Sequence, residues 1–234
     1  MSLYRDMVLV WLLVAVAVSV DQAAGQSQSS SSSSKHAKGS SARLVADVDA
    51  GTVAEGVYRN RALGLSCKIP AGWVLRTLEM NAREEDSGPG AGASEEKSSP
   101  QGTQRNTEED RGGRVLLAAF SRPPDAKGED VNASIVIAME KIATYPGLKE
   151  AAQYFGPLTE VAKAQGFIVD EEPYEMEMGT KVVVRGDFHK DVGARVMRQS
   201  TLAFLAQGYT VSITVIGGTE GEVEELVDGV GFGK

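Results

Sequence analysis

The stretch YRNRALGLSCKIPAGW, residues 58–73, decides how the rest of the chain is interpreted. Its apolar side chains recur at every second residue, at Leu63, Leu65 and Cys67. This period of two predicts a half-buried strand. Pro70 and Gly72 end the run, because proline cannot donate to a strand ladder and glycine tolerates turn dihedrals. Trp73 then lies where the next strand begins, and we expect it to bury a large area as a core anchor.

The order of residues in this stretch resembles the opening of PsbP-like domains, a superfamily that includes the extrinsic oxygen-evolving-complex protein and a Ran-binding nuclear-import factor. The matching residues are Tyr58, Asn60, Gly64, Pro70, Gly72 and Trp73. The resemblance implies an α+β fold, with an antiparallel sheet of about six or more strands packed against helices in an α/β/α sandwich. It carries over no catalytic residues, because the superfamily consists largely of binding and assembly modules.

Residues 1–25 have the features of a secretory signal peptide. Arg5 supplies a positive start, and residues 7–20 form an apolar run. This run is short for a membrane span, which needs about 20 residues. Small residues at 23–25 offer a cleavage site. The alternative interpretation is an uncleaved N-terminal anchor.

Residues 26–55 open with a serine-rich tract that cannot bury enough apolar surface to fold, so we expect a disordered tether. Residues 56–234 then form a single α/β domain. Within it, residues 81–113 hold almost no large apolar side chain, which predicts a disordered acidic insertion. The acidic clusters at 84–86 and 108–110 lack the spacing and glycine of an EF-hand loop, so a solvated loop is favoured over a calcium site.

Periodicity predicts the remaining elements of the domain. We expect strands at 73–80, 115–120, 133–142, within 167–178, and at 181–189, 196–206 and 209–216. Residues 147–165 predict a helix that Gly156-Pro157 kinks or divides. Thr219 and Glu222 have the form of a capping box at the start of a C-terminal helix. The apolar stripe of that helix is Val223, Leu226, Val227 and Val230.

Composition narrows the classes of function. The formal net charge of −8 disfavours a nucleic-acid partner, since phosphate binding requires a basic face. The single cysteine, Cys67, excludes an intrachain disulfide. Its place on the apolar face of a strand favours a buried inert thiol over a nucleophile or a metal ligand.

His189 is the histidine that falls within the expected domain. Asp187 lies two residues before it, so the two side chains share a face of the predicted strand. They allow a hydrolase site or half of a metal site, although a strand-end charge pair is the simpler interpretation. Glu175 and Glu177 likewise share a face of an edge strand. Their simplest role is pairing with arginines of the facing strands, Arg185, Arg195 and Arg198, and the alternative is an anion- or peptide-binding face.

These observations predict an exported, extracytoplasmic, non-enzymatic binding or accessory module. We expect an exported protein partner, no nucleic acid, no cofactor, no metal, and no membrane span after signal cleavage. The alternatives are a hydrolase that uses Asp187 and His189 with nearby acids, and an acidic metal-binding accessory protein. The candidate binding residues are Trp73, Tyr154, Asp187 and His189. Core packing competes with a binding role for both aromatic residues.

Overall fold

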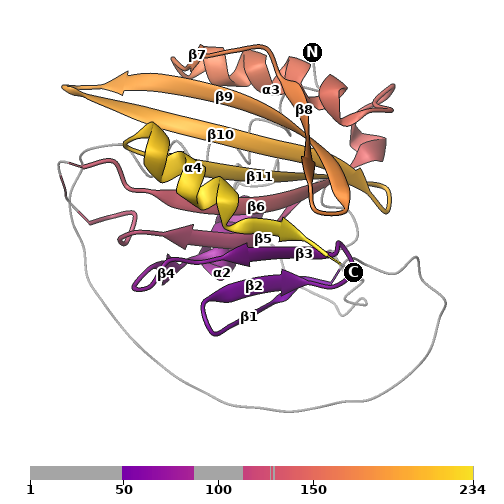
Figure 1. Ribbon diagram of the computed structural model, residues 1–234, viewed down its shortest axis with the longest axis horizontal. Helices are drawn as coiled ribbons and strands as arrows, with labels where there is room; N and C mark the ends of the chain where they lie inside the picture. Colours follow the sequence, from indigo (N-terminus) through magenta and orange to yellow (C-terminus); the bar gives the residue numbers. More distant parts are fainter. Residues whose placement is uncertain (1–48, 87–112, 127, 129, 234) are drawn as a thin grey trace, which may run out of the picture.

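The computed structural model describes residues 49–86, 113–126, 128 and 130–233, which form two antiparallel sheets and three α-helices (Figure 1). The predicted signal peptide at 1–25 lies outside the described residues. So do residues 26–48 of the predicted tether and residues 87–112 of the predicted insertion. The prediction of an antiparallel sheet packed with helices is confirmed.

The smaller sheet brings the first and last parts of the described chain together. Its strands, in spatial order, are β1 (Thr52–Ala54), β2 (Val57–Asn60), β3 (Leu65–Lys68) and β12 (Val230–Phe232). The opening stretch is therefore a hairpin and not the single strand that we expected. The Asn60 side chain forms the turn by accepting the Leu63 N–H at 3.0 Å, and Gly64 takes a φ of +64°. Since β1 pairs with β2, the predicted tether ends before residue 52 and not at residue 55.

The larger sheet contains the other eight strands. In spatial order they are β4 (Val74–Leu75), β5 (Gly113–Phe120), β6 (Ser134–Lys141), β11 (Tyr209–Gly217), β10 (Arg195–Ala206), β9 (Lys181–Val192) and β7 (Ile168–Val169), and β8 (Tyr174–Met178) also pairs with β9. Every pair is antiparallel. The strands predicted at 133–142 and 209–216 are confirmed by β6 and β11, but both faces of each strand are buried, so their alternation does not separate a buried from an exposed face.

Helix α2 (Thr77–Asp86) replaces most of the strand predicted at 73–80, so that prediction is wrong beyond Leu75. The helix covers the outer edge of β5. Asn81 accepts the Val115 N–H and donates to the Val115 carbonyl, both at 2.9 Å, and Thr77 accepts the Ala118 N–H at 3.0 Å. Side chains of α2 thus take the place of a strand partner. The predicted insertion also begins later than residue 81, because residues 81–86 are helical.

The remaining helices differ from their predictions at particular residues. Helix α3 (Ala151–Ala164) is preceded by a 3₁₀ turn, η1 (Ile142–Thr144), and it runs through Pro157 as one element and not as two. Helix α4 (Glu220–Asp228) buries Val223, Leu226 and Val227 as predicted. Val230 does not extend the helical stripe, because it begins β12.

Two apolar clusters lie on opposite faces of the larger sheet, since alternate residues of one strand belong to different clusters. In β6, Ile135 and Ile137 belong to the first cluster and Val136 to the second. The smaller sheet and α4 close the first cluster, and α2 and α3 close the second. Figure 1 shows α4 in front of the larger sheet and α2 behind it. The first cluster includes three apolar side chains of the opening stretch, Leu63, Leu65 and Cys67.

Candidate functional site

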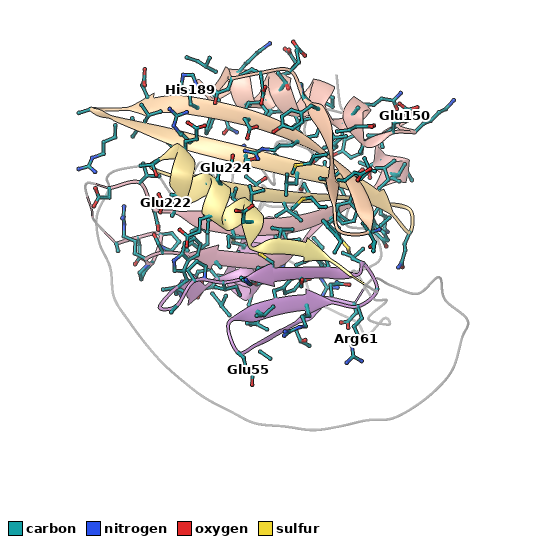
Figure 2. The ribbon with its side chains drawn as sticks, in the orientation of Figure 1. Glu55, Arg61, Glu150, His189, Glu222 and Glu224 are labelled. Carbon is teal, nitrogen blue, oxygen red and sulfur yellow. The ribbon has the colours of Figure 1, made fainter. Side chains whose placement is uncertain are left out.

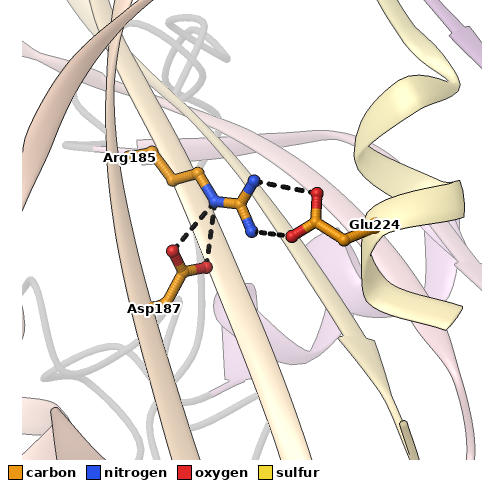
Figure 3. Close-up of polar contacts among 3 residues, drawn as sticks. All are labelled: Arg185, Asp187 and Glu224. Carbon is orange, nitrogen blue, oxygen red and sulfur yellow. Dashed lines mark hydrogen bonds and ion pairs between the residues drawn. The ribbon is translucent and has the colours of Figure 1, made fainter. Parts of the chain in front are cut away.

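Arg185 of β9 is a buried arginine, 7% exposed, that joins the larger sheet to helix α4. Its Nε donates to both carboxylate oxygens of Asp187, at 3.0 and 2.9 Å. Nη1 donates to Glu224 Oε2 at 3.1 Å, and Nη2 donates to Glu224 Oε1. Figure 3 shows the guanidinium held between the two carboxylates. Its position and orientation are therefore fixed by both strand and helix.

The charges of this cluster stabilise one another. Burial by itself would lower the pKa of Arg185, but the hydrogen bonds and charges of Glu224 and Asp187 outweigh it and raise the pKa. In return, the hydrogen bond from Arg185 lowers the pKa of Glu224. Arg185 and Glu224 are accordingly both charged near neutral pH.

A cavity of about 240 Å³ opens beside Arg185, between β8, β9, β10 and the first turns of α4. We call it the α4 groove. Its charged lining consists of Asp170, Glu171, Asp187, Glu220 and Glu224, with Arg185 and Arg198. Tyr174, 38% exposed, adds an aromatic side chain to the lining. Arg198 and Glu220 also line a second hollow, of about 700 Å³, so the groove continues past the start of α4.

The rim of the α4 groove carries acidic side chains that have no ion-pair partner among the described residues. Glu171 and Glu220 are exposed, and neither has an ion-pair partner within the described ranges. Partial burial raises the pKa of the Tyr174 hydroxyl; the nearby Arg185 lowers it, and the charges of Asp187, Glu171 and Glu224 raise it further. The groove therefore presents a mainly negative surface with the partly exposed ring of Tyr174.

The start of α4 is fixed by its own residues. Thr219 accepts the Glu222 N–H at 3.1 Å, which is one half of the predicted capping box. The Glu222 carboxylate accepts the N–H of Gly218 at 2.8 Å, so the other half is displaced by one residue. Figure 2 shows Glu222 and Glu224 on this helix. These contacts orient α4 so that Glu224 reaches Arg185.

The structure separates Asp187 from His189. Asp187 binds Arg185, whereas His189 Nδ1 contacts the carboxylate of Asp170. The two side chains therefore have different partners, and the Asp187–His189 pair that a hydrolase site would need does not form. Asp187 and Asp170 both line the α4 groove. His189 lies next to it through Asp170.

Two of the three arginines expected to pair with Glu175 and Glu177 have other partners. Arg185 binds Asp187 and Glu224, and Arg195 binds Asp130. Glu175 and Glu177 alternate with Tyr174 along β8, so they point away from the α4 groove.

The two aromatic candidates lie outside the α4 groove. Trp73 is half-buried and packs against the first apolar cluster, as a core anchor would. Tyr154 of α3 is 1% exposed and packs in the second cluster, on the opposite face of the sheet.

Cys67 is fully buried, and burial raises its pKa to about 12, so it remains a thiol. Within the described residues, no three His, Cys, Asp or Glu side chains are placed to hold a metal ion.

Glu220, Glu224 and Tyr174 are groove residues that the sequence interpretation does not assign to a site. Glu220 and Glu224 are four residues apart, at the border of the apolar stripe of α4. This spacing indicates that both reach the same edge of the helix. Nothing local in the sequence indicates that the edge faces Arg185, because the contact joins residues far apart in the chain.

Comparisons with known proteins give no family. No protein-family profile and no curated protein matches the chain. Among solved structures, the chain is similar to PA94 of Pseudomonas aeruginosa, a protein of unknown function described as a putative regulator, with 17% identity and a TM-score of 0.32 over 43% of this chain and 68% of that one. It is also similar to LpqN of Mycobacterium tuberculosis, involved in cell envelope biogenesis, with 10% identity and a TM-score of 0.34 over 73% of this chain and 83% of that one. Both TM-scores are too low to bear on function.

No helix in the described ranges is long and apolar enough to cross a membrane.

Proposed function

We propose that this chain is an exported, non-enzymatic binding module and that the α4 groove receives a basic segment of a partner protein. The observation that carries the proposal is the charge of the groove lining, in which carboxylates outnumber arginines five to two. A lysine or arginine of the partner would place its charge beside Glu171 and Glu220. Its aliphatic stem would lie against Tyr174.

The bonding of Arg185 favours binding over catalysis. Asp187 and Glu224 both accept hydrogen bonds from its guanidinium. The hydrogen bond from Arg185 lowers the pKa of Glu224, which makes this carboxylate a poor general base. The two carboxylates therefore support the shape of the groove, and the exposed acids of the rim meet the partner.

The location and the finer architecture belong to the same proposal. We infer that residues 1–25 direct the chain out of the cytoplasm, which makes the partner an exported protein. We also infer that the fold is a PsbP-like α/β/α sandwich. The apolar run at 7–20 supports the first inference. The two apolar clusters on opposite faces of the larger sheet support the second.

The test uses immobilised protein, residues 26–234, with the extracytoplasmic fraction of its source and with two labelled peptides of equal length. One peptide is rich in lysine and arginine, and the other is rich in aspartate and glutamate. We expect capture of one stoichiometric partner and binding of the basic peptide alone. Both interactions should weaken as salt increases, because the groove charges are screened.

A charge-reversed pair of variants localises the binding. The double variant Glu171→Lys with Glu220→Lys should bind the basic peptide at least about tenfold more weakly and should no longer capture the partner. Glu175→Lys with Glu177→Lys makes the same change in net charge on the other face of β8 and should leave both interactions intact. The proposal fails if neither the partner nor the basic peptide binds. It also fails if the two double variants lose binding equally.

A further inference from the structure

Glu140 of β6 is a buried carboxyl group that has no cationic partner among the described residues. It is 4% exposed, on the face of the larger sheet that packs against α3. Its Oε2 accepts a hydrogen bond from the hydroxyl of Tyr145, which directly follows η1. Its Oε1 accepts from the hydroxyl of Tyr154 on α3 at 3.4 Å. We call Glu140, Tyr145 and Tyr154 the Glu140 cluster.

In the part of the chain that the structure describes, the groups that face Glu140 from the packed elements are neutral. On the neighbouring strands, Gly113 of β5 and Thr210 of β11 lie directly opposite it. The Thr210 hydroxyl is buried, and it has no hydrogen-bond partner within the described ranges. From η1 and α3 the facing groups are the two tyrosines, whose rings meet edge to face at 6.1 Å. Lys141, the next residue of β6, points to the opposite face because strand side chains alternate.

A carboxylate in this position is costly. An ionised carboxyl group that leaves water needs a cation or several donors to replace its hydration. Glu140 has two hydroxyl donors, and one of them is at the upper limit of hydrogen-bond distance. When the group carries a proton, the cost disappears and the hydroxyl contacts remain.

We propose that the Glu140 cluster is a proton-dependent contact that holds η1 and the first turns of α3 against the sheet. The contact is closed when Glu140 is protonated, and it opens to water more readily when Glu140 is ionised. This inference is independent of the α4 groove, which lies on the other face of the larger sheet.

The direction of the pH dependence follows from the two states. Burial raises the pKa of Glu140 from 4.5 to about 7, against the hydrogen bonds of Tyr145 and Tyr154, which lower it. In the open, hydrated state the group returns to its ordinary value. Between these two values the closed state holds a proton that the open state lacks, so opening becomes about tenfold more favourable per pH unit. Below this window both states are protonated, and above it both are ionised.

The experiment measures both the proton and the opening in the full chain. Carboxyl carbon NMR of labelled glutamate follows the titration of Glu140. Hydrogen exchange, corrected for the intrinsic pH dependence of exchange, follows the amides of residues 142–158. We expect a titration near pH 7 and a loss of protection of about fortyfold between pH 5 and pH 7.

Three variants separate this contact from general effects of pH. Glu140→Gln keeps the shape and should stay protected at both pH values. Glu160→Gln removes an exposed acid of the same helix, with a side chain 65% exposed, and should keep the wild-type pH dependence. Tyr145→Phe removes a donor that favours the ionised form, so it should move the transition to higher pH.

If Glu140→Gln does not fold, Tyr145→Phe and the titration of the wild-type protein still decide the test. A titration of Glu140 near pH 4.5 would overturn the proposal. Protection of residues 142–158 that stays constant from pH 5 to pH 7 would overturn it as well.

Discussion

Gly179 occupies a turn where both its backbone angle and its surroundings require glycine. It lies between β8 and β9 with a φ of +60°, and a Cβ there would clash with the carbonyl oxygen of Phe232. Gly179→Ala should therefore lower the free energy of unfolding by about 3 kcal/mol. The left-handed backbone angle accounts for about 1–2 kcal/mol of this loss, and the clash accounts for the rest. Urea unfolding monitored by circular dichroism measures this loss.

Gly193 provides the matched control, because it lies in the turn between β9 and β10 with a φ of +62°, and a methyl group added there would meet no other atom within 4 Å. Gly193→Ala should cost only the backbone contribution, about 1 kcal/mol. Equal losses in the two variants would show that the contact between Gly179 and Phe232 does not matter.

Single residues also show what the sequence can and cannot predict about the candidate site. The alternation of Leu63, Leu65 and Cys67 predicts burial, and they are 2%, 2% and 0% exposed. The sequence also places Asp187 in a candidate site, but its partner is Arg185 and not His189. Alternation reports which face a side chain occupies, and it says nothing about which distant group reaches that face.

Helix α2 is the element whose type the sequence interpretation misses. Residues 77–86, TLEMNAREED, are rich in helix-forming residues but have only Met80 as a buried apolar side chain in the core. The lack of an apolar stripe removes the periodic signal for a helix. The helix instead forms where its side chains satisfy the backbone of β5, a contact that leaves no pattern in the sequence.

Asn81 gives the corresponding prediction at this scale. Its side chain pairs with both the N–H and the carbonyl of Val115, as a neighbouring strand would. Asn81→Ala should cost about 2 kcal/mol, since two backbone groups of β5 lose their partners. Leu78→Ala on the same helix removes a side chain that is 85% exposed and should cost less than about 0.5 kcal/mol. Chemical denaturation of the two variants compares them directly, and equal losses would contradict this role of Asn81.

At the scale of the whole molecule, the antiparallel sheet and the helices α3 and α4 could be predicted, but the second sheet could not. Short turns between alternating runs indicate which strands are neighbours along the chain. Strand β12 pairs with β3 across almost the entire described chain, with Phe232 opposite Leu65. A three-residue strand has too few residues to show alternation, so the sequence pattern alone places Val230 in the helix before it.

The closure of the smaller sheet by β12 makes the end of the chain part of the first apolar cluster. Phe232 is 7% exposed, and its ring meets Phe204 of β10 edge to face at 5.1 Å, so it joins the two sheets. Phe232→Ala should cost about 3 kcal/mol, because it leaves a cavity between the sheets, and Phe232→Leu about 1 kcal/mol. Urea unfolding should remain a single transition in both variants. A loss below about 0.5 kcal/mol for alanine would mean that the smaller sheet unfolds separately from the larger one.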